Sequence, residues 1–191
     1  MILIVDMNYK RDSLGYEEFV LPIVSIARKR GEVKVKHFSE LQRESVSGFE
    51  KIILSGTALK DHATLACVEK FDWLRAFQCP VLGICAGMQT MALVLGSRLL
   101  KHVEIGMREI VTVKENPLFS SDFDVYTLHD FSVKPSAEFD VLAEASGHIC
   151  IEAIKHREKD VYGVLFHPEV RNAEIIERFL SLNEKQLHYQ A

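Results

Sequence analysis

Short apolar runs alternate with amphipathic segments along the first half of the chain. Residues 2–5, 52–54 and 81–84 are continuous apolar runs, which are typical of strands buried on both faces of a parallel sheet. Residues 16–30 and 63–77 lie between them and carry apolar positions at helical spacing. This β-α-β order predicts parallel strands covered by helices.

One of these helices contains a proline, and its position leaves two interpretations open. Pro22 either interrupts a helix over residues 16–30 or marks the point where the helix begins. Gly31 follows a basic last turn and is the predicted C-cap. A short strand at residues 33–35 comes next, where valines alternate with lysines.

The second half of the chain has a different pattern. Short strands are predicted close together at residues 109–113, 125–128, 141–144, 149–155 and 161–165, before a last helix at 173–182. The predicted fold class is α/β: a three-layer α/β/α, flavodoxin-like arrangement with a mainly parallel central sheet and C-terminal antiparallel strands. Residues 1–191 are expected to form a single domain, with the polar residues 183–191 as a flexible tail.

Composition narrows the class of protein. The 191 residues are 48% hydrophobic and 26% charged, and 23 Lys and Arg against 27 Asp and Glu give a net charge of −4, so we expect no nucleic-acid partner. No apolar run reaches the roughly 18 residues of a membrane span, and the N-terminus lacks a basic leader, so we expect a cytoplasmic protein without a membrane partner. The four cysteines lack metal-ligand spacing, so we expect free thiols and no metal site.

The strongest chemical signal is a cysteine between two glycines. Gly83, Cys85 and Gly87 form a Gly-x-Cys-x-Gly stretch between the strand at 81–84 and a helical segment that follows. This is the form of a nucleophile elbow, in which the reactive atom lies on a tight strand-to-helix turn. The partial positive charge at the helix N-terminus favours a thiolate there. Cys85 is therefore the predicted nucleophile.

A nucleophilic cysteine needs a base and a residue that orients the base. His167 follows an apolar strand, Pro168 holds it in an extended conformation, and Glu169 can point the same way as the imidazole. All three catalytic candidates, Cys85, His167 and Glu169, then follow strands at one sheet edge. The order Cys, His, Glu excludes an α/β-hydrolase, in which the acid precedes the histidine.

The two stretches around these residues resemble the signatures of class I, triad-type glutamine amidotransferase domains. Residues 83–89 (GICAGMQ) and 163–170 (GVLFHPEV) carry the resemblance, which spans nearly the whole chain. It implies that Cys85 attacks the side-chain amide of L-glutamine, releases ammonia and forms a γ-glutamyl thioester that water hydrolyses to glutamate. Residues 106–119, 153–156 and 162–169 are most similar to the separate glutaminase subunit of archaeal-type GMP synthases.

The resemblance also implies a substrate site. The backbone N–H groups of Thr57 and Ala86 would form the oxyanion hole, beside Gly56, and Gln89 would hold the substrate. The segment Leu128, His129, Asp130 and Phe131 would grip the α-amino and carboxylate groups, partly through its backbone. Ammonia would pass to an ATP-dependent synthetase subunit, so this chain itself is expected to need no cofactor, and ATP and Mg would belong to the partner.

Two segments depart from the family pattern. Thr57 and Ala58 replace a Gly-Pro pair, and a β-branched residue resists positive φ, so the oxyanion loop is expected to be set differently or only on partner binding. Leu128 and Asp130 replace a serine and a glycine. Two alternatives therefore stay open: a γ-glutamyl peptidase or hydrolase with the same triad, and a non-catalytic regulatory homologue.

Overall fold

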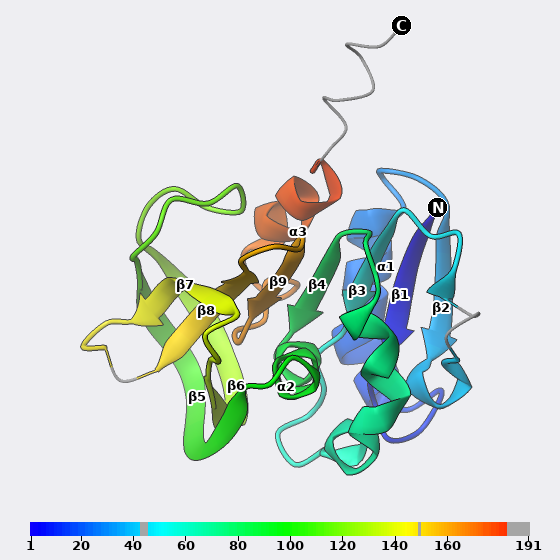
Figure 1. Ribbon diagram of the computed structural model, residues 1–191, viewed down its shortest axis with the longest axis horizontal. Helices are drawn as coiled ribbons and strands as arrows, with labels where there is room; N and C mark the ends of the chain where they lie inside the picture. The colour runs from blue at the N-terminus through cyan, green and yellow to red at the C-terminus, as the bar shows by residue number, and fades with distance from the viewer. Residues whose placement is uncertain (43–45, 149, 183–191) are drawn as a thin grey trace, which may run out of the picture.

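The computed structural model describes residues 1–42, 46–148 and 150–182. Within these residues, nine strands form one sheet in the order β2-β1-β3-β4-β9-β8-β7-β5-β6 (Figure 1). The flexible tail predicted for residues 183–191 lies outside the described residues, as does Ile149, the first residue of a predicted strand.

Five neighbouring strands run parallel and form one half of the sheet. They are β2 (Val33–His37), β1 (Ile2–Asp6), β3 (Lys51–Leu54), β4 (Val81–Ile84) and β9 (Val161–Val164). Every residue of β1, β4 and β9 is buried, as expected for strands that are covered on both faces. The continuous apolar runs of the sequence therefore predicted these strands correctly.

Helices pack against both faces of this parallel half. On one face, α1 (Leu21–Ala27) and α3 (Ala173–Leu180) share a core with side chains such as Ile4 and Val164. On the other face, α2 (Ala86–Val94) and the 3₁₀ segment η4 (Ala63–Arg75) share a core with Leu3 and Leu54 (Figure 1). None of the helices within the described residues is both long and apolar enough to cross a lipid bilayer.

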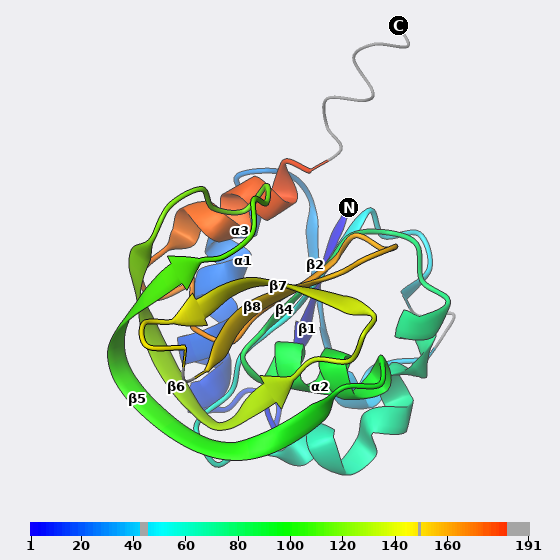
Figure 2. The same cartoon turned by 60° about the vertical axis from the view of Figure 1, so that its left-hand side comes forward.

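The other half of the sheet is antiparallel and strongly curled. It contains β5 (Arg98–Thr112), β6 (Phe123–Lys134), β7 (Phe139–Ala145) and β8 (Ile151–His156), and Figure 2 shows β5 and β6 curling around the shorter strands. Four strand pairings are parallel and four are antiparallel, so the prediction of a mainly parallel sheet is wrong. The sheet is mixed, and the three-layer, flavodoxin-like description stays a prediction.

The helix boundaries show whether Pro22 interrupts a helix or marks its start. Pro22 lies in the first turn of α1, where a missing N–H costs nothing. The preceding segment η1 (Tyr16–Val20) forms a π-helical turn. The predicted C-cap at Gly31 is wrong, because α1 ends at Ala27 with Arg28 as its C-cap, and Gly31 does not adopt positive φ. A short 3₁₀ turn, η2 (Phe38–Glu40), follows β2.

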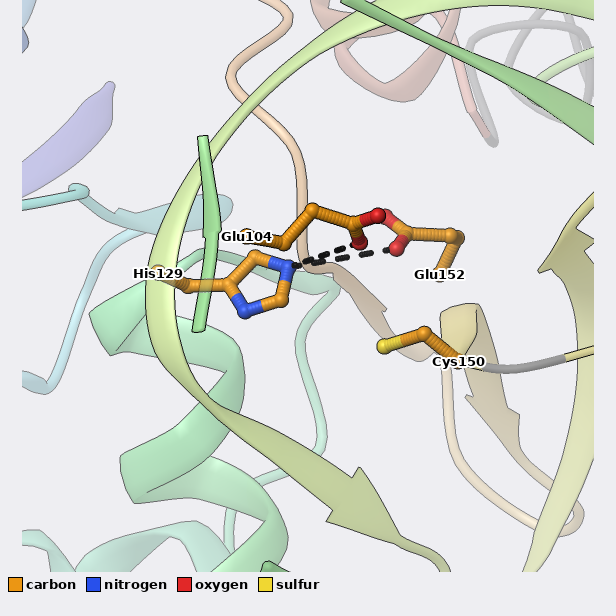
Figure 3. A group of neighbouring side chains, drawn as sticks. All are labelled: Glu104, His129, Cys150 and Glu152. Carbon is orange, nitrogen blue, oxygen red and sulfur yellow. Dashed lines mark ion pairs between the residues drawn. The ribbon is translucent and has the colours of Figure 1, made fainter. Parts of the chain in front are cut away.

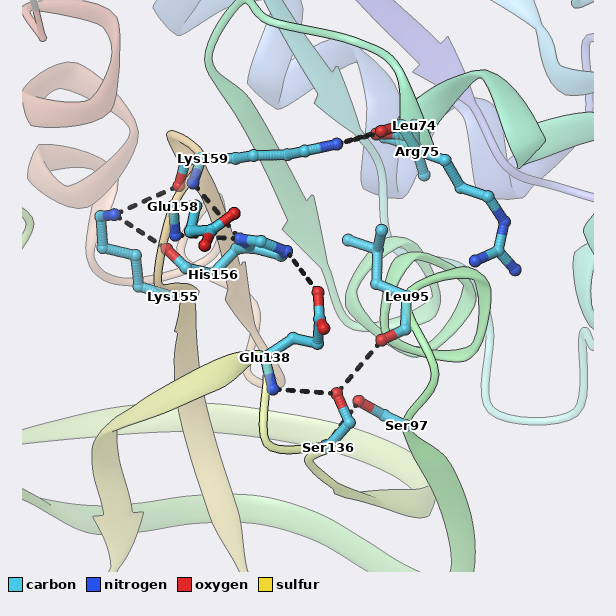
Figure 4. Close-up of polar contacts among 10 residues, drawn as sticks. All are labelled: Leu74, Arg75, Leu95, Ser97, Ser136, Glu138, Lys155, His156, Glu158 and Lys159. Carbon is cyan, nitrogen blue, oxygen red and sulfur yellow. Dashed lines mark hydrogen bonds and ion pairs between the residues drawn. The ribbon is translucent and has the colours of Figure 1, made fainter.

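Polar contacts tie the antiparallel half to the helices at the amino-terminal end of the parallel strands (Figure 4). Ser136 donates its hydroxyl to the carbonyl of Leu95, at the end of α2, over 3.1 Å. Lys159 donates to the carbonyl of Leu74 in η4 over 3.2 Å. These contacts lie opposite the edge at which β4 ends, so they brace the fold without occupying that edge.

At the turn between β4 and α2, backbone segments lie in close contact. A Cβ built on Gly87 would lie 2.4 Å from the carbonyl oxygen of Leu54, and one on Gly83 would lie 2.7 Å from the backbone of Gly87. Neither glycine adopts a positive φ, so backbone conformation does not explain why glycine is needed. A side chain is excluded at both positions because the backbone lies too close to other backbone atoms. The helix can therefore begin directly at the strand end only with glycine at these positions.

We expect Gly87→Ala to destabilise the chain by about 1–3 kcal/mol, because the new methyl group collides with main-chain atoms that cannot rotate away. The measurement is the free energy of unfolding in urea. Gly31→Ala is the matched control, since a Cβ there meets nothing within 4 Å. Equal stability of the two variants would show that the joint tolerates a side chain.

Candidate active site

Cys85 lies at the joint between β4 and α2 in a strained backbone conformation. Its φ is 48° and its ψ is −105°, a region that residues with a side chain rarely adopt. Two backbone hydrogen bonds hold it there: Cys85 donates to the carbonyl of Val164 over 2.8 Å, and Gln89 donates to the carbonyl of Cys85 over 2.9 Å. Strain maintained by its surroundings is typical of an activated nucleophile.

His167 and Glu169 follow β9, which is the parallel neighbour of β4. The Nδ1 atom of His167 lies 2.7 Å from Oε1 of Glu169, and both side chains are 0% exposed. The backbone N–H of His167 donates to the carbonyl of Tyr126 in β6 over 2.9 Å, and the ring of Phe19 packs against the imidazole. The imidazole of His167 is therefore oriented by a carboxylate and held by a backbone hydrogen bond and an aromatic ring.

The electrostatic environment favours a charged imidazole. Burial alone would lower the pKa of His167, but the carboxylate of Glu169 and the thiol of Cys85 outweigh it and raise that pKa well above its usual value. Within the described residues, Nε2 of His167 forms no hydrogen bond of normal geometry. The raised pKa makes Nε2 a strong base beside the thiol of Cys85, so the imidazole can hold the thiol proton as an imidazolium.

The loop after β3 lies against the same imidazole. A Cβ on Gly56 would lie 2.5 Å from Cε1 of His167, so glycine is required there by close approach. Neither Gly56 nor Thr57 adopts positive φ. The β-branched Thr57 therefore fits this backbone without strain, and the expectation that the loop is set differently or only on partner binding stays a prediction. The hydroxyl of Thr57 donates to the carbonyl of Asp61 over 3.2 Å and ties the loop to itself.

Strand β6 passes over the nucleophile. The thiol of Cys85 lies 3.5 Å from the carbonyl oxygen of Leu128. The side-chain amide of Gln89, predicted to hold the substrate, donates to the carbonyl of Phe131 over 2.9 Å. Ala86, the other predicted oxyanion donor, is the first residue of α2. The structure therefore brings these predicted residues together around Cys85, with Gln89 bound to β6.

Asp130 is held by His62 and Lys101, two residues that the sequence does not single out. His62 Nε2 lies 2.8 Å from Oδ1, and Lys101 Nζ lies 2.6 Å from Oδ2 and above the ring of Phe131. Burial alone would raise the pKa of Asp130, but the hydrogen bonds from Lys101 and His62 lower it below its usual value. No sequence spacing links 62, 101 and 130, so only the fold reveals this group.

His129 is the predicted site residue whose side chain points elsewhere. It is buried, and its Nε2 atom faces Glu104 and Glu152 at 3.7 and 3.9 Å. Its backbone still belongs to the segment above Cys85. Any contact of His129 with a substrate would therefore involve the main chain.

The fold and sequence both have known relatives. A solved structure from Thermoplasma acidophilum, described as a candidate GMP synthase subunit, has a TM-score of 0.82 at 20% identity, covering 99% of this chain and 96% of that one. A glutamine-hydrolyzing GMP synthase subunit of Methanocaldococcus jannaschii is 39% identical over 102 residues, which is 50% of this chain and 53% of that protein. The corresponding subunit of Methanobrevibacter smithii is 34% identical over 126 residues, or 60% and 65% of the two chains.

These curated relatives are matched over about half to two thirds of their length. The family model described as "Glutamine amidotransferase class-I" matches residues 16–183, a stretch that contains Cys85, His167 and Glu169. The chain therefore belongs to the class-I glutamine amidotransferase family.

Proposed function

We propose that the chain hydrolyses L-glutamine to glutamate and ammonia at Cys85. The observation that carries the proposal is the strained thiol at the β4–α2 joint beside the buried pair of His167 and Glu169, whose contact is 2.7 Å. The relatives named as subunits of glutamine-hydrolyzing GMP synthases support the same chemistry.

In the first half of the reaction, His167 Nε2 takes the proton of the Cys85 thiol, and Sγ attacks the γ-carboxamide carbon of glutamine. The oxyanion that forms is stabilised by the backbone N–H groups of Thr57 and Ala86, each worth roughly 3–4 kcal/mol of barrier. His167 then gives its proton to the amide nitrogen, the C–N bond breaks, and ammonia leaves. Glu169 accepts from Nδ1 and holds the ring in the tautomer that exposes Nε2.

In the second half, water replaces ammonia at the γ-glutamyl thioester. His167 removes a proton from that water, hydroxide adds to the thioester carbon, and the C–S bond breaks. The proton returns to the sulfur, and glutamate leaves with both oxygens on its γ-carbon. The chain's own residues supply every proton transfer, so we propose that this chain uses no cofactor and no metal ion in catalysis.

The substrate's α-amino group needs a carboxylate, and Asp130 is the candidate beside Cys85. Its two oxygens each accept one hydrogen bond, from His62 and Lys101, and a carboxylate has lone pairs for more. The carbonyl groups of Leu128 and Phe131 and the backbone of His129 and Gly56 complete the proposed pocket. Gln89 would contribute by holding β6 in place, because its amide already donates to Phe131.

The burial of the site supports the proposal that a partner subunit must open it. Cys85 is only 3% exposed, and the side chains of His167 and Glu169 are fully covered, so glutamine enters only when the segments above Cys85 move. We propose that an ATP-dependent synthetase subunit, possessing the ATP and Mg²⁺ site, triggers this opening and receives the ammonia. The names of the relatives support a GMP synthase partner. We propose that the ammonia aminates XMP and that the reaction takes place in the cytoplasm.

We expect the chain to release ammonia from glutamine at a rate that rises when a GMP synthase ATP-hydrolysing subunit is added. Cys85→Ala should lower this rate at least about 10⁴-fold with or without the subunit, because the covalent route is lost. Ammonia release and mass spectrometry after treatment with a glutamine-mimicking diazoketone measure both effects.

Label on any residue other than Cys85 would contradict the assignment of the nucleophile. Faster turnover of γ-glutamyl peptides than of glutamine would favour the peptidase alternative, and no turnover with any synthetase would favour a regulatory homologue.

We expect Gly56→Ala to lower kcat roughly 10²-fold, because its methyl group would push the His167 ring away from its position beside Cys85. Steady-state kinetics measure this effect, and Gly31→Ala is the control, since it adds the same methyl group in open space. An unchanged kcat in a folded Gly56→Ala variant would mean that the ring position does not limit catalysis.

We expect Asp130→Asn to raise KM for glutamine about tenfold or more while kcat changes little, because a charged hydrogen bond to the α-amino group is lost. Asp140→Asn is a matched control, since Asp140 also pairs with two cations, Lys114 and Arg157, but lies on β7. Equal KM values for the two variants would exclude Asp130 from substrate binding.

A further inference from the structure

Four side chains with metal-binding atoms meet in the interior of the curled half of the sheet (Figure 3). Glu104 comes from β5, His129 from β6 and Glu152 from β8, while Cys150 directly precedes β8. All four residues are buried, and one ligand atom from each lies within 4.8 Å of the others. Three strands thus converge on one small polar centre.

The polar atoms of this centre have no partners that explain their burial. Within the described residues, both ring nitrogens of His129, both oxygens of Glu152 and Oε2 of Glu104 form no hydrogen bond of normal geometry. Only weaker contacts reach them, from the thiol of Cys150 to Glu152 and from the backbone of His102 to His129. The side chains of His129 and Glu152 are 0% exposed, and leaving such groups unpaired is costly. Figure 3 shows the imidazole directed at both carboxylates.

The distances fit a shared ligand better than direct contact. His129 Nε2 lies 3.7 Å from Glu104 Oε2 and 3.9 Å from Glu152 Oε1, beyond hydrogen-bond length. Two ligand atoms bound to one tetrahedral zinc ion are separated by about 3.3–3.8 Å, given metal–ligand bonds of roughly 2.0–2.3 Å. A small inward shift of these side chains would therefore place an ion between them.

The charges of the centre are also unbalanced. Arg108 pairs with Oε1 of Glu104, and His102 lies 3.8 Å from its other oxygen. Within the described residues, no Lys or Arg side chain forms an ion pair with Glu152, which feels the charge of Arg108 only at longer range.

We propose that Glu104, His129, Cys150 and Glu152 bind one Zn²⁺ ion. A nitrogen, a thiolate sulfur and two carboxylate oxygens form a ligand set that suits zinc, whereas Mg²⁺ and Ca²⁺ prefer oxygen alone. The two carboxylates and the thiolate carry three negative charges, which the divalent ion and Arg108 balance. Zinc binding displaces the protons from Cys150 and Glu152 into solvent.

The ion acts as a clamp on β6. In the sheet order, β7 and β5 separate β8 from β6, and the curl brings the two strands back toward each other (Figure 2). Zinc bound by both His129 and Glu152 would link β6 directly to β8 across the curled half of the sheet. Because Leu128 and Asp130 flank His129 on the same strand, the clamp holds the segment that covers Cys85.

The test titrates Co²⁺ into the metal-free chain carrying Cys85→Ala, which removes the other buried thiol next to an imidazole. We expect about one equivalent to bind, with the intense visible bands of tetrahedral Co²⁺ and a thiolate-to-cobalt charge-transfer band. Adding Cys150→Ser should abolish the charge-transfer band and weaken binding at least about 10²-fold. Adding Cys67→Ser, at a partly exposed free cysteine, should change neither.

Absence of bound Co²⁺ in the Cys85→Ala chain, or a charge-transfer band that survives Cys150→Ser, would overturn the proposal. Thermal unfolding provides a second readout should Cys150→Ser fold poorly. Free Zn²⁺ at about 100 times its Kd should raise the Tm of the Cys85→Ala chain by roughly 5–10 °C, and Glu152→Gln should remove this shift. An equal Tm shift in Glu152→Gln would also overturn it.

Discussion

The position of one strained residue depends on a close contact between two pieces of backbone. Cys85 adopts φ 48° and ψ −105° because α2 begins immediately where β4 ends. That junction exists only because Gly83 and Gly87 let the first turn of the helix touch the β4 and β3 main chains. Moving α2 outward by the width of a methyl group would relax Cys85 and move its thiol away from His167. The close contact at Gly83 and Gly87 therefore determines both the packing of α2 and the position of the Cys85 thiol.

The parallel and the antiparallel halves of the sheet both contribute residues near Cys85. Its parallel half supplies Cys85 and His167, the proposed nucleophile and base, because β4 and β9 are neighbours and end at the same edge. Its antiparallel half returns β6 over that edge, where Tyr126 accepts from His167 and Leu128 from Cys85. Neither half contains a complete site, so the curl of the sheet is as necessary as the elbow.

The sequence predicted what depends on local patterns. Continuous apolar runs identified the buried parallel strands, and the glycines around Cys85 identified the elbow. The length of β5 was missed, because most of its positions are at least partly exposed and its apolar residues do not mark a buried face. The pairing of Asp130 with Lys101 and His62 was missed for another reason: it joins segments far apart in sequence, without any periodic signal.

The same limit explains why a chain with no metal-ligand spacing has a cluster of ligand atoms. The four residues are spread from 104 to 152, and only antiparallel pairing and curl bring them together. Side chains alternate across a strand, so Asp130 and His129 point to opposite sides of β6. One side faces the proposed glutamine site and the other faces the buried cluster. Because a strand is stiff over two residues, the packing of His129 against the cluster also fixes the position of Asp130 on the opposite face.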